Sequence, residues 1–269
     1  MKNLINKVAV VTGGGSGIGK STAIALANEG CDLALADINE EGMKETAEEI
    51  EKIGRKVSQH KINVADKLDM QRLVDEVIES HEHVHIVVNN AGITVSGDFI
   101  EQTMEDIEWI LGINLWGVIY GCKLFIPYLQ KEEESHIVNI CSSSGIMPTP
   151  RLSTYTTSKF AVRGLSETLR IELAQFNIGV TTVHPGVIKT NIPHASRFKD
   201  MERQKQSIEM FEKRGHPPES VANKIIKAIK NNSHRILIGP EAYIIDILKR
   251  VFPVLSDKLI AMAYKKAMS

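Results

Sequence analysis

Tyr155 and Lys159 lie four residues apart, and Ser142 precedes them in the chain. On a helix this spacing puts both side chains on one face, so an ammonium would lie close to a phenol. A nearby ammonium favours the phenolate, which predicts that the pKa of Tyr155 falls from about 10 toward working pH. Such a phenol can take a proton from an alcohol or return one to a carbonyl. Ser142 can hold the substrate oxygen, and Ser143 and Ser144 are adjacent alternatives.

A glycine-rich segment from Thr12 to Gly19 directly follows the β-branched run 8–11. Backbone without side chains, together with a helix N-terminus, can approach a pyrophosphate closely. Asp37 ends the next apolar run, where a carboxylate accepts hydrogen bonds from an adenosine ribose and repels a 2′-phosphate. Ser16, within the glycine turn, adds no positive charge to receive such a phosphate. The sequence therefore predicts NAD in preference to NADP, with the alternative that Asp37 only caps the following helix.

Short apolar runs alternate with helical patterns along the chain. Continuous apolar strands separated by helices predict a parallel sheet covered on both faces, which is the doubly wound, Rossmann-type α/β fold. Ligands of this fold sit beyond the carboxyl ends of the strands. We expect strands at about 8–11, 33–36, 56–62, 86–89, 137–141, 180–184 and 235–238. We expect helices at about 19–28, 39–53, 66–80, 104–130, 153–176 and 220–230.

The chain is long enough for one sizeable core, and we expect a single domain over residues 1–269. Residues 1–100 would form mainly the cofactor-binding half, and residues 101–192 the catalytic half. Residues 193–218 carry many charges and little periodicity. This composition, after the sixth strand, predicts either a mobile substrate lid or an ordinary surface helix.

The last segment, residues 240–269, combines apolar positions with interleaved basic ones, as in an amphipathic helix. Such a helix can lie on a membrane surface, cover a hydrophobic substrate pocket or pack on another subunit. Packing is favoured, because core-facing stripes are the commoner origin of these patterns. The apolar positions are Ile244, Ile245, Ile247, Leu248, Val251, Phe252, Val254, Leu255, Leu259, Ile260 and Met262, and the basic ones are Lys249, Arg250, Lys258, Lys265 and Lys266.

The charge balance is even, with Lys+Arg 32 against Asp+Glu 33 and a net charge of -1, which indicates no nucleic-acid partner. Cys31, Cys122 and Cys141 are far apart and odd in number, which fits reduced thiols in a cytoplasmic protein. The first strand begins so near Met1 that no room is left for a signal peptide. We find no apolar run long enough to cross a bilayer.

His81, His83 and His85 alternate in a way that could gather zinc ligands on one strand face. The run straddles a helix end and a strand start, away from the expected site, and we expect no acidic or thiol partner close by. We therefore predict no metal site. Cys141, beside Ser142, is predicted to be a buried strand residue and not a nucleophile.

In order and context these motifs resemble those of the short-chain dehydrogenase/reductase family, in its main soluble branch with a Tyr-x-x-x-Lys active site. The resemblance runs from about Lys7 to Thr190 and more loosely to the end. It implies interconversion of an alcohol and a ketone with NAD(H), in a homodimer or homotetramer assembled through two long helices. It rests on Thr12-Gly13-x-x-x-Gly17-x-Gly19, Asn89-Asn90-Ala91-Gly92, Asn114, Ser142, Tyr155-x-x-x-Lys159 and Pro185-Gly186.

The resemblance implies a role for each catalytic residue. Tyr155 would be the acid and base, Lys159 would lower its pKa and hold ribose hydroxyls, and Ser142, whose separation from Tyr155 matches the family, would orient the substrate oxygen. Asn114 would carry a water that links Lys159 to solvent. The cofactor-binding residues implied are Gly13, Gly15, Ser16, Gly17, Ile18, Gly19, Asp37, Asn63, Val64, Asn90, Ala91, Gly92, Tyr155, Lys159, Pro185, Gly186, Ile188 and Thr190.

One motif departs from the family. Where an Asp-Val pair often follows the third strand to read the adenine, this chain has Asn63-Val64. An amide oxygen can still accept from the adenine amino group, so we expect weaker but retained binding.

The apolar C-terminal segment and the long lid suggest a lipophilic secondary alcohol, such as a steroid, a retinoid or an acyl-chain substrate. Two alternatives are an NADPH-preferring carbonyl or acyl reductase and a dinucleotide-sensing binding protein without chemistry. The intact set Asn114, Ser142, Tyr155 and Lys159 argues against the second alternative.

Overall fold

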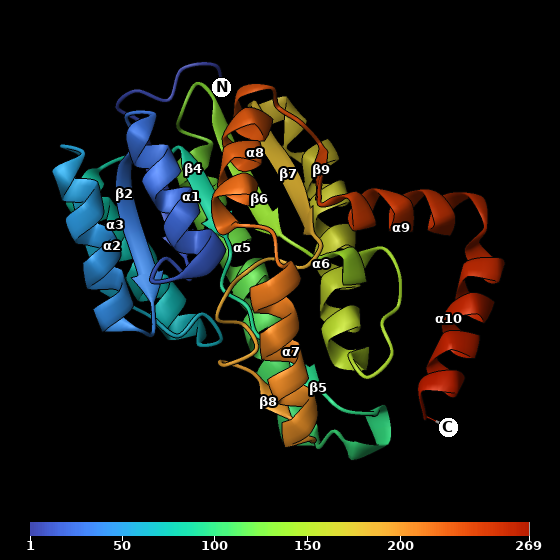
Figure 1. Cartoon of the computed structure of the whole chain (residues 1–269). Coiled ribbons are helices and arrows are strands. Elements are labelled where there is room, and N and C mark those ends of the chain that lie inside the picture. The colour runs from blue at the N-terminus through green and yellow to red at the C-terminus, as the bar shows by residue number, and fades with distance from the viewer. Residues whose placement is uncertain (269) are drawn as a thin grey trace.

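The computed structural model describes residues 1–268, and within them seven strands form one parallel sheet (Figure 1). Their order is β3-β2-β1-β4-β6-β7-β9, so the chain winds outward in both directions from the β1–β4 pair. The predicted doubly wound fold is confirmed. The strands are β1 (Val8–Thr12), β2 (Asp32–Asp37), β3 (Val57–Lys61), β4 (Ile86–Asn89), β6 (Ser135–Ile140), β7 (Ile178–Pro185) and β9 (Arg235–Ile238).

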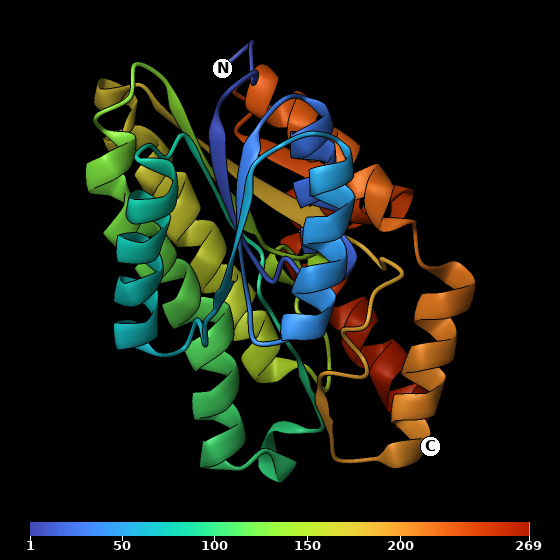
Figure 2. The ribbon, with the colours of Figure 1, turned by 90° about the vertical axis from the view of Figure 1, so that its left-hand side faces the viewer.

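Helices cover both faces of the sheet (Figure 2). On one face lie α1 (Gly17–Asn28), α2 (Glu40–Lys52) and α8 (Pro218–Lys230). The other face carries α3 (Lys67–His81), α5 (Gly117–Leu129) and α6 (Ser153–Glu172). Apart from α5, each of these helices begins and ends within a few residues of its predicted bounds, and Asn39 caps α2 by accepting from Gly42 N at 3.1 Å.

The apolar strands contribute side chains to two separate hydrophobic cores, one on each face of the sheet. Ala9 and Val11 of β1 join the core under α1, while Val10 between them joins the core that contains Phe125 of α5. Successive side chains of a strand point to opposite faces, so a strand buried on both sides must be apolar throughout. All five residues of β1 are buried, as its unbroken apolar pattern predicts.

The long helix predicted over residues 104–130 is interrupted. It consists of α4 (Met104–Leu111), a π-helical turn (Gly112–Trp116) and α5. By length and composition alone, Met104–Leu129 is the one stretch of the described chain apolar enough to cross a membrane, which differs from our expectation of none. Its buried residues, including Phe125 and Leu129, pack in the core of this fold.

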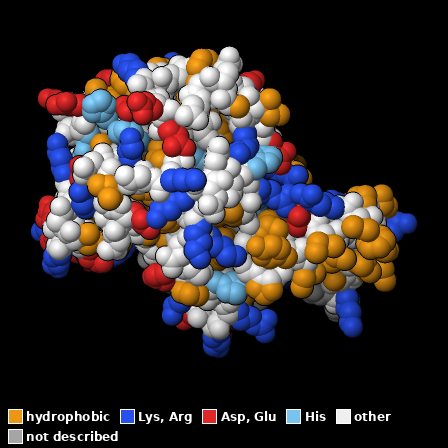
Figure 3. All heavy atoms as spheres, turned by 90° about the horizontal axis from the view of Figure 1, so that it is seen from above, with side chains coloured by type: hydrophobic (Ala, Val, Ile, Leu, Met, Phe, Trp, Pro, Cys, Tyr) orange, Lys and Arg blue, Asp and Glu red, His pale blue; other side chains and the backbone are white. Residues whose placement is uncertain are grey.

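The chain after β9 leaves the body of the molecule as two helices, α9 (Pro240–Val251) and α10 (Pro253–Met268) (Figure 1). The predicted extension 240–269 is therefore helical over its described part, and residue 269 lies outside the described residues. Seen from above, hydrophobic side chains cover this projecting part (Figure 3). We call α9 and α10 together the arm.

Candidate active site

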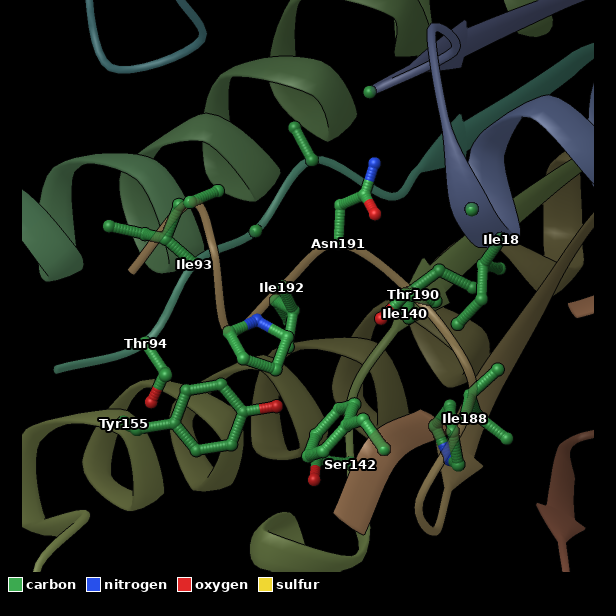
Figure 4. Close-up of a pocket in the computed structure, with 18 of the residues that line it drawn as sticks. Ile18, Ile93, Thr94, Ile140, Ser142, Tyr155, Ile188, Thr190, Asn191 and Ile192 are labelled. Atoms are coloured by element: carbon green, nitrogen blue, oxygen red, sulfur yellow. The ribbon is translucent and has the colours of Figure 1, made fainter. Parts of the chain in front are cut away.

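A pocket of about 780 Å³ lies at the carboxyl ends of the strands, where this fold places its ligands. Gly13, Asp37, Asn90, Ser142 and Pro185, at or just beyond the ends of five strands, all line it. Figure 4 shows Ile18, Ile188 and Thr190 on one side of this space and Tyr155 on the other. Every predicted site residue lines the pocket except Gly15, Gly19 and Asn114.

The glycine turn is shaped as a dinucleotide requires. Gly13 and Gly17 have φ of +67° and +52°, a conformation that favours glycine. A Cβ on Gly13 would lie 2.7 Å from Asn90 Nδ2, and one on Gly17 would lie 3.0 Å from Thr190 Cγ2. The Ser16 side chain makes no capping hydrogen bond to α1 within the described residues. The first N–H groups of α1 are therefore open toward the pocket and fit a pyrophosphate.

Asn90 fixes the position of this turn. Its side-chain nitrogen donates to the carbonyl oxygens of Thr12 at 2.9 Å and Gly13 at 3.1 Å. Gly19 supports the turn from behind, because a Cβ there would lie 2.0 Å from Gly13 O. Gly15 donates its N–H to Asp37 at 2.9 Å. Gly15 and Gly19 therefore shape the turn without lining the pocket.

Asp37 bonds to nearby backbone and also lines the pocket, while the N-cap of α2 is Asn39; the contact of Asp37 with a ribose stays a prediction. One carboxylate oxygen accepts from Gly15 N, and the other accepts from Asn39 N at 3.0 Å, just before α2. The same carboxylate lines the pocket. The basic residues that line the pocket in the described chain are Arg151, Lys159 and Arg203, which come from in front of α6, from α6 and from α7 (Met201–Arg214). None of them belongs to the segments around Asp37.

Asn63 and Val64 follow β3 and also line the pocket. The side-chain oxygen of Asn63 accepts from Ala65 N at 3.1 Å, so it already stabilises the turn after the strand. A carbonyl oxygen has two lone pairs, and the second is available to a ligand.

Ser142 and Tyr155 are hydrogen-bonded neighbours in the wall of the pocket. Ser142 follows β6, and its hydroxyl oxygen accepts from Ser144 N at 3.1 Å at the start of a 3₁₀ turn, Ser143–Gly145. Tyr155 lies in the first turn of α6, and its hydroxyl points into the pocket (Figure 4). Lys159 lies one helical turn after Tyr155 and is buried. Its Nζ donates to Ile140 O at 3.0 Å and lies 5.6 Å from the centre of the Tyr155 ring.

Burial controls the protonation of both groups. It raises the pKa of Tyr155 to about 12, although a hydrogen bond from Ser142 acts in the opposite direction. Burial also lowers the pKa of Lys159. A low-dielectric site disfavours the charged form of each group. The expectation that Lys159 brings the pKa of Tyr155 toward working pH is therefore wrong for this structure, because desolvation is the largest effect on Tyr155 and the Lys159 ammonium is bonded to Ile140 O.

Asn114 lies in the π turn, is fully buried and does not line the pocket. Its Oδ1 accepts from Ile93 N at 2.9 Å, and its Nδ2 donates to Ile93 O at 2.9 Å and to Ser158 at 3.3 Å. A Cβ placed on Gly92 would lie 3.4 Å from Asn114 Oδ1 and 3.6 Å from Lys159 Nζ, so these two atoms flank one spot. π turns inside α-helices are frequent at functional sites.

The predicted lid contributes pocket residues that we did not name from the sequence. A two-residue strand, β8 (Arg197–Phe198), pairs with β5 (Val95–Ser96), and α7 follows. The expectation of little periodicity here is wrong, because the α7 residues that face the pocket recur at the spacing of one helix face. They are Arg203, Gln206, Ser207, Met210 and Phe211. This helical spacing is visible in the sequence and could have identified these pocket residues.

The three alternating histidines belong to two separate networks. His81 and His60 both bond the Ser58 hydroxyl, at 2.8 and 2.7 Å. His83 and His85 both contact Glu132, at 2.8 and 3.0 Å. The expectation of no acidic partner nearby is therefore wrong. No group of three His, Cys, Asp or Glu side chains within residues 1–268 has the arrangement of a metal site.

All three cysteines are buried and free. The predicted burial of Cys141 is confirmed, but Cys141 lies directly after β6 and not within the strand. Burial raises the pKa of the Cys141 thiol to about 11, and its Sγ donates to Lys159 O at 3.0 Å. A thiol held in this form is a poor nucleophile.

Comparison with known proteins agrees with this geometry. A family profile described as short chain dehydrogenase matches residues 7–200. The SadH protein of Mycobacterium tuberculosis, named as an oxidoreductase, is 36% identical over 270 residues, which cover 99% of this chain and 98% of that protein. A cyclohexanol dehydrogenase of Acinetobacter sp. is 35% identical over 198 residues, 73% of this chain and 78% of that protein.

A crystal structure of a short chain dehydrogenase/reductase from Burkholderia phymatum, in complex with NAD, has the same fold with a TM-score of 0.89 and 29% identity. The match covers 95% of this chain and 97% of that chain. The profile and the relatives together assign the chain: it belongs to the short-chain dehydrogenase/reductase family of oxidoreductases.

Proposed function

We propose that the protein interconverts a lipophilic secondary alcohol and its ketone with NAD(H), and that Tyr155 is the general acid and base. One observation carries this proposal. Tyr155 and Ser142 line the same pocket as the glycine turn, with its open helix N-terminus, and Asp37. A proton-transfer group and a dinucleotide cradle thus share one pocket.

The glycine turn and Asp37 would hold the dinucleotide, whose nicotinamide would supply the hydride chemistry between the alcohol and the ketone. The Tyr155 phenolate takes the hydroxyl proton during oxidation, and the phenol returns it during reduction. The Ser142 hydroxyl holds the substrate oxygen beside Tyr155. Lys159, which also lines the pocket, holds the ribose hydroxyls of the bound cofactor.

Asn114 positions the proton path in this proposal. Its Oδ1 and Lys159 Nζ flank the spot beside Gly92, where a water can connect the ammonium to solvent. The hydrogen bonds of Asn114 to Ile93 hold this part of the wall in place.

NAD(H) is favoured over NADP(H) by the charge at the Asp37 end of the pocket. The carboxylate there repels a 2′-phosphate, and the basic residues of the pocket wall come from other segments. The Burkholderia relative was solved with NAD. We assign residues 1–100 mainly to cofactor binding, 101–192 to catalysis and 193–218 to a substrate lid.

The lipophilic substrate is supported by the side chains at the lid end of the pocket. Ile93, Ile192, Phe198, Met210 and Phe211 line it there. An apolar wall with few polar groups favours an apolar ligand that is oriented by those few groups. The name of the Acinetobacter relative, cyclohexanol dehydrogenase, is that of an enzyme for a cyclic secondary alcohol. We also propose that the protein works in the cytoplasm, in keeping with its three unpaired thiols.

The test has two steps. NADH and NADPH are titrated in parallel by nucleotide fluorescence, and a panel of secondary alcohols and ketones is then assayed with the preferred cofactor. We expect tighter binding of NADH and turnover of lipophilic alcohols. A higher kcat/KM with NADPH would overturn the cofactor assignment. Binding without turnover of any compound would favour the dinucleotide-sensing alternative.

A further inference from the structure

Ser142, which holds the substrate oxygen in the proposed function, lies just beyond the end of its strand. β6 ends at Ile140, and after it Cys141 N still donates to Val183 O of β7 at 2.8 Å. Pro185, the last residue of β7, has no N–H with which to extend the ladder. The ladder between the two strands therefore does not reach Ser142, and other groups must hold its peptide in place.

The imidazole of His184 is one of these groups. His184 follows Val183 in β7 and is fully buried. Its Nδ1 lies 2.9 Å from Ser142 O. A carbonyl oxygen can only accept, so Nδ1 carries a hydrogen and donates it. Ser142 O also accepts from Gly145 N at 3.0 Å, so it is held both from β7 and from its own 3₁₀ turn.

The other ring nitrogen of His184 has no such use. Nε2 is buried and has no hydrogen-bond partner among residues 1–268. Burial lowers the pKa of His184 to about 4; the charges of Arg235 and Arg163 act in the same direction, while Asp246 opposes them, and the ring is neutral at working pH. A buried nitrogen without a partner costs free energy that an apolar side chain would avoid. The bond to Ser142 O is therefore what the imidazole contributes at this position.

The same serine is connected to the reacting groups through its side chain. Its hydroxyl oxygen accepts from Ser144 N at 3.1 Å, and the hydroxyl is hydrogen-bonded to Tyr155 at the pocket (Figure 4). The backbone of Ser142 is extended, with φ -171° and ψ 164°, and its carbonyl and its side chain share one Cα. A shift of the carbonyl therefore displaces the hydroxyl. A misplacement of a reacting or positioning group by roughly 1 Å can lower a rate by about 10²-fold.

The far end of the turn is anchored by packing. Ile146, directly after the turn, is buried against Leu237 of β9 and Ala242 of α9. No described residue of the arm lines the pocket, so the alternative that the extension covers the pocket is wrong for this structure. The arm thus supports the far end of the turn from outside the pocket, whereas the near end, at Ser142, depends on His184.

We propose that His184 is a positioning residue for the reaction: by donating from Nδ1 to Ser142 O, it holds the Ser142 hydroxyl where that hydroxyl meets Tyr155 and the substrate oxygen. This inference rests on the proposed function, because it assigns His184 to the step in which Ser142 acts. It requires a donor at the position of Nδ1, and it gives no role to Nε2 or to the size of the ring.

Three single variants separate the hydrogen bond from the packing. His184→Asn places an amide donor at about the position of Nδ1, His184→Gln places it at about the position of Nε2, and His184→Leu fills the space without a donor. We expect kcat to fall about tenfold or more in His184→Gln and His184→Leu, and to stay within about threefold of the wild type in His184→Asn. The Kd for NADH should change less than about twofold in all three, because His184 does not line the pocket. His234→Asn, exposed before β9, is the control.

Thermal unfolding shows whether each variant is folded at the assay temperature, and if His184→Leu is not, the comparison of Asn with Gln decides. A kcat equal to that of the wild type in every folded variant would overturn the inference. An equal loss in His184→Asn and His184→Gln would overturn it as well, because the position of the donor would then have no effect.

¹⁵N NMR of the wild type tests the same bond without turnover. We expect a neutral His184 ring with its hydrogen on Nδ1, identified by the signal that His184→Asn lacks. A ring with its hydrogen on Nε2 alone would have no donor for Ser142 O and would overturn the inference while leaving the proposed function intact. The expected ring in a wild type that turns over no alcohol or ketone would instead refute the proposed function.

Discussion

Lys159 Nζ lies 5.6 Å from the centre of the Tyr155 ring, on the same helix, and donates its hydrogen bond to Ile140 O at 3.0 Å. The ammonium is thus tied to β6, and it lies beside the Tyr155 ring while its hydrogen bond goes to the backbone. Burial raises the pKa of Tyr155 to about 12 and lowers that of Lys159, because a low-dielectric site disfavours the charged form of each group. Tyr155 is therefore a protonated phenol at neutral pH.

Replacing Tyr155 by Phe keeps the ring and removes the proton-transfer group. We expect kcat to fall by about 10³-fold or more, in the upper range for loss of a general acid or base. The Kd for NADH should stay within about threefold, because binding rests mainly on the glycine turn and Asp37. Stopped assays and NADH fluorescence measure the two quantities. Tyr128→Phe, on α5 and outside the pocket wall, is the control. Substantial residual activity in Tyr155→Phe would contradict the role of Tyr155 as general acid and base.

The pH dependence of the activity follows from the direction in which the pKa of Tyr155 is shifted. Oxidation needs the phenolate, and a pKa raised to about 12 keeps the group protonated at neutral pH. We expect kcat/KM for alcohol oxidation to rise steadily between pH 6 and pH 10. Ketone reduction needs the phenol and should be sustained at neutral pH. An oxidation profile that is already flat from pH 7 would contradict this expectation.

Asp37→Asn removes the charge and keeps an oxygen that can accept from Gly15 N or Asn39 N. We expect NADPH to bind about tenfold more tightly than it does to the wild type, because the repulsion of the 2′-phosphate is gone. Binding of NADH should weaken. Parallel fluorescence titrations measure both Kd values, and Asp66→Asn, at the cap of α3, is the control. An unchanged ratio of the two Kd values would show that Asp37 is only a structural residue.

Asp106→Asn should destabilise the fold by roughly 2 kcal/mol at pH 7, since hydrogen bonds to charged groups are lost from a buried site. Burial alone would raise the pKa of Asp106, but hydrogen bonds from Lys199, from Thr103 N and from Arg197 hold it well below its usual range. A depressed pKa stabilises the folded state above the unfolded value near 4 and loses that effect as pH falls.

Urea unfolding between pH 7 and pH 3 therefore gives a direct check. The gap between the wild type and Asp106→Asn should narrow as pH falls from 5 to 3, because the unfolded carboxylate takes up its proton first. Asp75→Asn, exposed on α3, should follow the wild type at every pH. A gap that stays constant with pH would exclude this role of the carboxylate.

Asn114→Ala removes two hydrogen bonds to the Ile93 backbone and one to Ser158. We expect a loss of about 2–3 kcal/mol, because buried backbone groups are left without partners. We also expect kcat to fall more than tenfold under conditions where the variant is fully folded. Asn231→Ala, exposed at the end of α8, is the control. A folded Asn114→Ala with the kcat of the wild type would remove Asn114 from the proton path.

The positions of the strands and their burial on both faces could be predicted, because a sheet covered by helices on both sides requires unbroken apolar runs such as that of β1. The same holds for Asn39, whose cap of α2 depends only on local geometry. The glycine turn could be placed because its neighbours in the chain are a strand and a helix.

Other features depend on contacts between distant segments. The π turn at Asn114 adds one residue to a helical turn and leaves the hydrophobic pattern almost unchanged, so composition does not reveal it. The β5–β8 pair joins two residues near position 95 to two near 197, and such short strands carry no pattern of their own. The pKa of Tyr155 depends on how deeply the pocket buries the phenol, which spacing along one helix does not show.

The strand order has a consequence for how the protein is made. The residues that line the pocket run from Gly13 to Phe211. Strand β1 pairs with β4, which a ribosome synthesises about seventy-five residues later. Pairing between segments this far apart in the chain slows folding. A nascent chain therefore displays its glycine turn well before the residues that complete the cradle have emerged. The dinucleotide can stabilise only the finished fold, so it acts as a selector for completed chains over truncated ones.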